Sequence, residues 1–98
     1  MQAMHIISRK VLQQFWEKHA DAENALRRWY KIVEQTDFAN LSALRHTFPS
    51  ADNVGDLVVF NIGGNKFRLI TSIHFNRGKV YIRHVLTHEE YDRGAWKQ

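Results

Sequence analysis

Residues 57–75 read LVVFNIGGNKFRLITSIHF and carry the clearest strand and turn pattern of the chain. β-Branched and aromatic side chains fill both of its ends, and Gly63-Gly64 between them is a two-residue hairpin signal. The pattern therefore predicts one strand over Leu57–Ile62 and a second over Asn65–Phe75. A further tight turn at residues 76–78 leads into a third predicted strand, Lys79–Leu86. We expect an antiparallel meander.

Two amphipathic helices are predicted before the strands. Ser8 is a candidate cap for the first helix, whose apolar residues recur at helical spacing until His19. Asp21 is a candidate cap for the second helix, in which Trp29 lies on an apolar stripe. The short connection between them predicts a helical hairpin that packs on the sheet.

Shorter elements complete the predicted fold. Met4–Ile7 reads as an edge strand, and Met1–Ala3 before it reads as an alternative start. Phe38–Phe48 predicts one or two helical turns. Thr87, with Glu90 three residues later, matches a capping box for a short terminal helix. The expected class is α+β: an N-terminal helical hairpin on a small antiparallel sheet, with a short C-terminal helix.

The composition limits the organisation and the chemistry. Ninety-eight residues with 44% hydrophobic content suffice for one core, so we expect a single domain over residues 1–98. The chain has no Cys, which removes disulfides, thiolate zinc sites and cysteine nucleophiles. Its histidines lack metal-ligand spacing, so we expect no metal or cofactor. No apolar run is long enough for a membrane span or a secretory signal, and we expect a soluble, cytoplasmic protein.

Positive charge is concentrated in one segment. The formal net charge is +4, and no acidic residue occurs between Asp56 and Glu89. The cations of this segment are Lys66, Arg68, Arg77, Lys79 and Arg83. An acid-free basic surface favours a polyanionic partner, and we expect these five residues to bind RNA. The alternative is an ordinary solvated face of an antiparallel sheet.

Strand alternation indicates which of these cations lie together. Residues two apart point to the same side of a sheet, so Phe67 and Leu69 are expected in the core. Lys66 and Arg68 then lie on the opposite, open face. The same alternation in the following strand adds Arg83 to that face.

The residues at the end of this face suit cleavage of RNA by its own 2′-hydroxyl. That reaction needs a base, an acid and cations for the phosphorane, and histidine exchanges protons near neutral pH. We therefore expect a catalytic role for His88. Arg68 and Arg83 are expected to contact phosphate in a bidentate manner. Lys66 is expected to bind phosphate or, in its neutral form, to act as a base. Tyr91 is expected to stack on a base or orient a phosphate oxygen. The alternatives are that His88 is an ordinary surface residue and that Tyr91 only anchors the last helix.

Several motifs together resemble the HigB family of bacterial toxins. They are VFNIGGNKFRLI (residues 59–70), YIR (81–83) and THEEYD (87–92), together with MHII (4–7) and FPSAD (48–52). The resemblance covers essentially the whole chain from Met4.

This resemblance implies a RelE-like fold and an mRNA interferase that cuts messenger RNA, usually in the ribosomal A site. It also implies inhibition by a HigA-type helix-turn-helix antitoxin, whose complex with the toxin binds operator DNA. Carried over by position, it supports Lys66, Arg68, Arg83, His88 and Tyr91 as site residues, and leaves Asp92 as a participant or as a partner of an arginine. Two other classes stay open: a non-catalytic RNA- or ribosome-binding module on the same face, and a purely structural interaction domain.

Overall fold

The computed structural model describes residues 4–97; Met1–Ala3, set aside above, and Gln98 lie outside the described residues. The strands are β1 (His5–Ile7), β2 (Asp52–Val54), β3 (Leu57–Ile62), β4 (Phe67–His74) and β5 (Lys79–Thr87). The helices are α1 (Arg9–Lys18), α2 (Glu23–Gln35), α3 (Leu41–Thr47) and α4 (His88–Arg93), with short 3-10 turns η1 (Ala20–Ala22), η2 (Phe75–Arg77) and η3 (Ala95–Lys97). No helix within residues 4–97 is long and apolar enough to cross a membrane.

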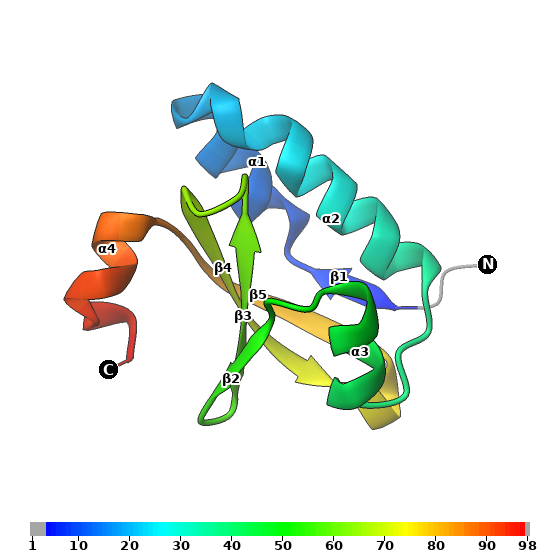
Figure 1. Cartoon of the computed structure of the whole chain (residues 1–98). Coiled ribbons are helices and arrows are strands. Elements are labelled where there is room, and N and C mark those ends of the chain that lie inside the picture. The colour runs from blue at the N-terminus through cyan, green and yellow to red at the C-terminus, as the bar shows by residue number, and fades with distance from the viewer. Residues whose placement is uncertain (1–3, 98) are drawn as a thin grey trace.

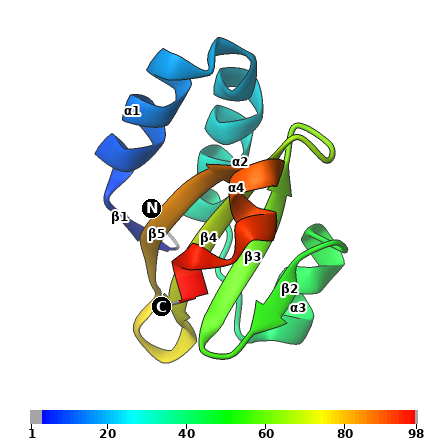
Figure 2. The same cartoon turned by 90° about the vertical axis from the view of Figure 1, so that its left-hand side faces the viewer.

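The five strands form one sheet between two helical layers. Its order is β1-β5-β4-β3-β2, so β4 is the central strand. Figure 1 shows α1 and α2 on one side of the sheet and α4 on the other. Figure 2 looks onto the second side, where α4 lies in front of the sheet. The α+β class, the helical hairpin and the short C-terminal helix are therefore confirmed.

The expectation of a wholly antiparallel sheet is wrong at one edge. β1 pairs parallel with β5, with Ile6 opposite Val80. A parallel pair needs a long crossover between its strands, and here the chain from β1 to β5 passes through the helices and the whole meander. The antiparallel part also gains β2, a three-residue strand that pairs with the start of β3.

The turn between β3 and β4 is longer than predicted. It spans four residues, Gly63 to Lys66, with Ile62 paired to Phe67. Gly63 and Gly64 have φ of 63° and 71°, a left-handed conformation that favours glycine. Lys66 therefore lies in the turn and not on the middle strand, which corrects the expected alternation at that position.

Both predicted helix starts differ in detail. Ser8 stands at the cap position of α1, but its side chain makes no capping hydrogen bond. Asp21 lies in η1, and α2 begins two residues later at Glu23. The capping box of the last helix is confirmed, because Thr87 Oγ1 accepts from the Glu90 N–H at 3.2 Å and Glu90 Oε1 accepts from the Thr87 N–H at 2.9 Å.

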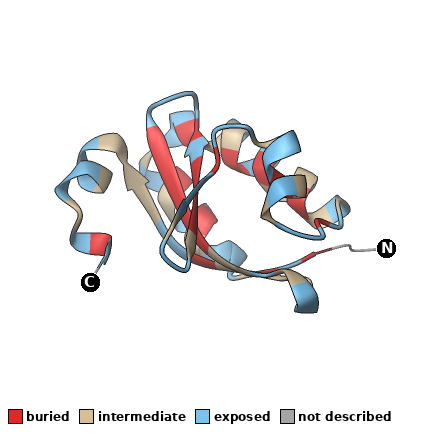
Figure 3. Cartoon of the chain, turned by 60° about the horizontal axis from the view of Figure 1, so that its bottom comes forward, coloured by how far each residue is buried: buried red, intermediate tan, exposed pale blue. Residues whose placement is uncertain are grey.

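The main core lies between the sheet and the helical hairpin. Trp29 of α2 is 2% exposed and meets the ring of Phe60 edge-on, with ring centroids 5.3 Å apart. Leu69 of the central strand and Leu26 of α2 are fully buried in the same cluster. Figure 3 shows buried positions on the helices and strands that face each other. Each such side chain contributes about 1.5–3 kcal/mol relative to the exposed state.

The other face of the sheet is not open, contrary to expectation. Val59 and Ile70 lie on it and form a second apolar cluster with Trp96 of η3. Tyr91 and Leu86 pack against this cluster. Water exclusion from these strand positions is the physical reason that the C-terminal segment folds back over the sheet.

Candidate active site

The predicted site gathers where β5 ends and α4 begins. The capping box holds Thr87 at the helix start, so His88 is the first residue of α4. The main-chain N–H of His88 donates to the carbonyl oxygen of Lys66 at 2.9 Å. This bond joins the β3–β4 turn to the helix and brings Lys66 and His88 next to each other.

His88 is oriented by a carboxylate one helical turn away. Its Nδ1 lies 2.9 Å from Oδ2 of Asp92, and the side chains are 43% and 60% exposed. The spacing of four residues places the two side chains on one helix side. No hydrogen bond to Nε2 of His88 occurs among residues 4–97, and the side chain as a whole is 43% exposed.

Arg68 is 8% exposed, whereas the sequence predicted an open cation. Its Nη1 donates to the carbonyl oxygens of Asn65 and Phe67 at 3.2 and 3.1 Å, and its Nη2 donates to Oδ1 of Asn65 at 2.6 Å. The guanidinium also lies over the ring of Tyr91, 5.4 Å from its centroid. Within the described chain no carboxylate pairs with Arg68, so its charge is met only by neutral oxygens and a ring. A nearly buried cation without a counter-ion favours an anion at its exposed edge.

Tyr91 connects the site to the second apolar cluster. Its ring stacks on Trp96 with centroids 5.0 Å apart and planes at 14°, and its carbonyl oxygen accepts from Nε1 of Trp96 at 2.9 Å. The stack covers Ile70 and fixes the Tyr91 ring above Arg68. The anchoring role considered for Tyr91 is therefore present in the structure, and a direct role toward RNA remains a prediction.

The alternation of β5 is interrupted at Arg83. The β4–β5 pairing shifts between Ile70 and Thr71, which face His84 and Ile82, so Arg83 is the extra residue of a β-bulge. Beyond the bulge the faces of β5 exchange: Val85 packs in the main core and Leu86 in the second cluster, the reverse of the prediction.

This bulge also sets the direction of the Arg83 side chain. The guanidinium lies 5.6 Å from the ring centroid of Tyr81. Arg68 pairs with Leu86, three residues beyond Arg83, which is about 10 Å along the strand. The exposed Arg83 therefore contacts Tyr81, and no contact between Arg83 and Arg68 or His88 occurs among the described residues.

Arg77 and Lys79 lie at the other end of the sheet. Lys79 pairs with His74, whereas Thr87, the residue before His88, pairs with Phe67. Lys79 and Thr87 are eight residue steps apart, which corresponds to about 25 Å of strand. The structure therefore does not bring these two cations to the His88 site.

Lys66 is the exposed cation of the site. Its Nζ lies 3.5 Å from Oδ2 of Asp21 in η1, and the two side chains are 67% and 57% exposed. Such a solvated pair contributes little, so Lys66 stays free to exchange Asp21 for a phosphate. No group of three or more His, Asp or Glu side chains that could hold a metal ion occurs in the part of the chain that the structure describes.

Three residues of this region were not identified from the sequence. The sequence left Asp92 either as a participant in the reaction or as a partner of an arginine, whereas the structure pairs it with His88. The four-residue spacing between His88 and Asp92 on a helix could have indicated this contact. Asn65 was read as a strand residue, yet its side chain and carbonyl hold Arg68. Trp96 was not assigned, although an aromatic residue near the chain end often covers an exposed apolar patch.

The fold and the site together define a small α+β protein in which an exposed imidazole, an exposed lysine and an arginine without a carboxylate partner among the described residues suit a phosphate-bearing polymer. The chain belongs to the HigB toxin family: the family described as the RelE-like toxic component of a toxin-antitoxin system matches residues 22–94. The chain is 37% identical over 92 residues to the mRNA interferase toxin HigB of Escherichia coli K12, covering 91% of this chain and 88% of that protein. It is 32% identical over 93 residues to the mRNA interferase HigB of Escherichia coli O6:H1, covering 92% and 90%.

Proposed function

We propose that this protein is the toxin of a toxin-antitoxin pair and that it acts as an endoribonuclease on mRNA. The relatives named above are mRNA interferases and align over most of both chains. The observation that carries the proposal is that α4 holds both the His88–Asp92 pair and Tyr91, whose ring lies against the guanidinium of Arg68, a cation without a carboxylate partner among the described residues.

The proposed reaction is attack of an RNA 2′-oxygen on the adjacent phosphorus. The P–O5′ bond breaks as the P–O2′ bond forms, which yields a 2′,3′-cyclic phosphate and a free 5′-hydroxyl. One proton leaves the 2′-oxygen and another reaches the 5′-oxygen, and His88 is the group that exchanges one of them through Nε2. Asp92 accepts from Nδ1 and so holds the ring in the orientation and tautomer that this transfer needs.

Cations near His88 stabilise the negative charge that develops on the phosphorane. Arg68 is held rigidly by Asn65 and Phe67, so its charge needs no reorganisation during the reaction. Lys66 supplies a mobile cation from the turn, and Tyr91 presents a ring edge for a base next to the scissile bond.

The remaining basic residues serve RNA binding outside the reacting centre. Arg83 extends the positive surface along β5, and Arg77 with Lys79 does so at the far end of the sheet. Phosphate contacts of this kind position an RNA strand without reading its sequence.

We further propose that cleavage occurs on the ribosome, in the A site, and that a HigA-type helix-turn-helix antitoxin neutralises the protein. The complex of the two would bind operator DNA through the antitoxin. These proposals rest on family membership and on the basic surface. In the A site, the toxin would meet mRNA that is held in place and accessible.

Induction of the protein in cells, followed by mapping of mRNA 5′ ends, tests the function. We expect new 5′-hydroxyl ends within translated regions. If the adjacent gene encodes a small helix-turn-helix protein, the neighbouring antitoxin of this proposal, we expect its co-expression to remove them. Purified protein with mRNA, with and without ribosomes, then separates ribosome-dependent cleavage from cleavage of free RNA. A protein that binds mRNA or ribosomes but leaves the transcript whole would instead be the non-catalytic module.

A further inference from the structure

The outer edge of β3 is only half covered by its neighbour. β2 pairs with Leu57, Val58 and Val59 and then ends, so the last part of β3 has no strand on that side. A two-residue turn joins β2 to β3, with Val54 before it and Leu57 after it. In such a hairpin the main-chain N–H and C=O of Leu57 point toward β2, and those of Val59, two residues later, do the same. Alternation then directs the N–H and C=O of Asn61 to the same, now open, side.

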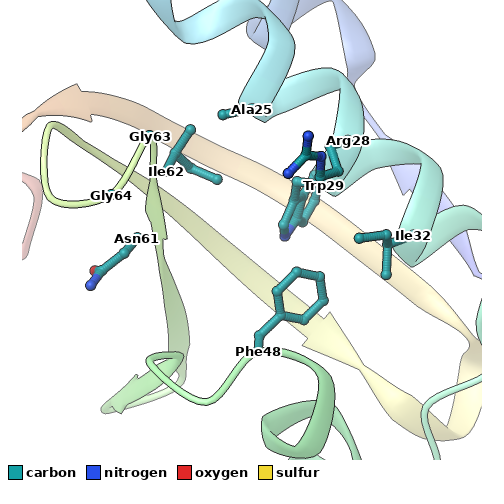
Figure 4. A pocket seen from close by; sticks show the side chains of 9 residues that line it. All are labelled: Ala25, Arg28, Trp29, Ile32, Phe48, Asn61, Ile62, Gly63 and Gly64. Carbon is teal, nitrogen blue, oxygen red and sulfur yellow. The ribbon is translucent and has the colours of Figure 1, made fainter.

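A hollow of about 260 Å³ adjoins this open edge. Trp29 and Ile32 of α2 form one wall, Phe48 after α3 forms a second, and Asn61 with Ile62 of β3 forms a third. Figure 4 shows the Asn61 side chain pointing away from Trp29 and Phe48, so the main chain of Asn61 lies closer to them than its amide does. An apolar hollow therefore lies beside an unpaired stretch of strand.

Trp29 contributes an unused donor to this hollow. Its indole Nε1 is buried and is the one buried side-chain nitrogen or oxygen without a hydrogen-bond partner among residues 4–97. In Figure 4 this nitrogen lies on the side of the indole that faces Phe48. A buried N–H without an acceptor is costly, and an incoming carbonyl oxygen between Trp29 and Phe48 would remove that cost.

The charged side chain that lines the hollow is positive. Arg28 lines it and makes no ion pair within the described residues, and no Asp or Glu is among the lining residues. A single cation at the rim of apolar walls suits a carboxylate on an otherwise apolar segment. RNA fits less well, because it has no main chain to pair with a strand edge and needs several cations for its phosphates.

We propose that this edge and hollow bind an extended segment of the antitoxin, added as a strand beside Asn61. An apolar side chain of the segment fills the space between Trp29, Ile62 and Phe48, a carbonyl oxygen accepts from Nε1 of Trp29, and an acidic side chain meets Arg28. Main-chain bonds to a strand edge supply affinity and a side-chain pocket supplies specificity in this mode of peptide binding. The inference rests on the antitoxin partner proposed above and names its docking surface, whose lining includes Gly63 and Gly64 of the turn that also carries Lys66.

The test compares antitoxin affinity, measured by titration calorimetry with the purified neighbouring antitoxin, across matched variants. Trp29→Phe removes the unused N–H and keeps an aromatic ring; we expect about tenfold weaker binding in a variant that stays folded under the assay conditions, as urea unfolding checks. Asn61→Pro removes the main-chain N–H that points to the open side of β3 and that makes no hydrogen bond to β4. We expect this variant also to bind about tenfold more weakly. Asn61→Ala, which keeps the main chain, should bind as the unmodified protein does. Arg28→Glu should weaken binding further and reduce its salt dependence.

The possible results separate the docking surface, the antitoxin partner and RNA binding. If the unmodified protein binds the antitoxin and Trp29→Phe, Asn61→Pro and Arg28→Glu bind it equally well, the docking surface is wrong while the antitoxin partner stands. If the unmodified protein does not bind the antitoxin, the partner proposal and this inference both fail, and mRNA cleavage is judged separately. Loss of mRNA cleavage with unchanged antitoxin affinity in Arg28→Glu would assign the hollow to RNA and overturn the inference.

Discussion

Replacement of His88 separates catalysis from stability more sharply than any other single change. The imidazole is 43% exposed and its partner Asp92 is 60% exposed, so their ion pair contributes about 0.2–1 kcal/mol to folding. His88→Ala should therefore lower the free energy of unfolding by less than about 1 kcal/mol. Loss of a positioned proton-transfer group costs about 10²–10⁴-fold in rate. We expect a folded protein that has lost nearly all mRNA cleavage.

Replacement of Asp92 should reduce the cleavage rate less than replacement of His88 does. An orienting contact worth at most about 1 kcal/mol changes a rate by at most about fivefold. Asp92→Ala should therefore reduce cleavage by about two- to fivefold, far less than His88→Ala does.

The assay is the single-turnover rate of cleavage of a translated mRNA on ribosomes, with urea unfolding of each variant in parallel. His46→Ala serves as the control, because His46 is an exposed histidine of α3 outside the site. Cleavage by His88→Ala within about twofold of the unmodified rate would refute the assignment of the proton-transfer residue.

Four further changes test the surroundings of His88 and the basic surface beyond it. Trp96→Ala uncovers Ile70 and should lower the free energy of unfolding by about 3 kcal/mol, measured by urea denaturation; a change below about 1 kcal/mol would mean that the terminal segment is not docked in solution. Thr87→Ala removes the helix cap and should cost about 1 kcal/mol in thermal unfolding, with a fall in cleavage because His88 follows the cap. Arg68→Ala should lower kcat about tenfold or more, whereas Arg77→Ala should raise the KM for mRNA and leave kcat unchanged; the opposite split would exchange their roles.

Much of the fold could be predicted from local patterns. The helical spacing before Trp29, the glycine pair of the turn and the capping box at Thr87 each determine nearby backbone conformation. The turn length and the parallel edge were missed, because both depend on contacts between segments distant in sequence. Lys66 moved from strand to turn for that reason.

The candidate site was predicted as a set of residues but not as a geometry. Side-chain chemistry in the sequence indicated His88, Arg68 and Tyr91, and the acid-free segment indicated a polyanion. Whether these side chains meet depends on the register of β4 with β5 and on the bulge at Arg83, which alternation cannot reveal.

Periodicity, turn residues and motifs are local properties, so the α+β class, the family and the residue types available for the chemistry could be predicted from the sequence. Three features depend on packing between distant segments: Arg68 is nearly buried beside Tyr91, Asp92 contacts His88, and the second face of the sheet is covered. Burial explains them, because Ile70 and Val59 are removed from water by Trp96 near the chain end, and that packing also holds Tyr91 over Arg68.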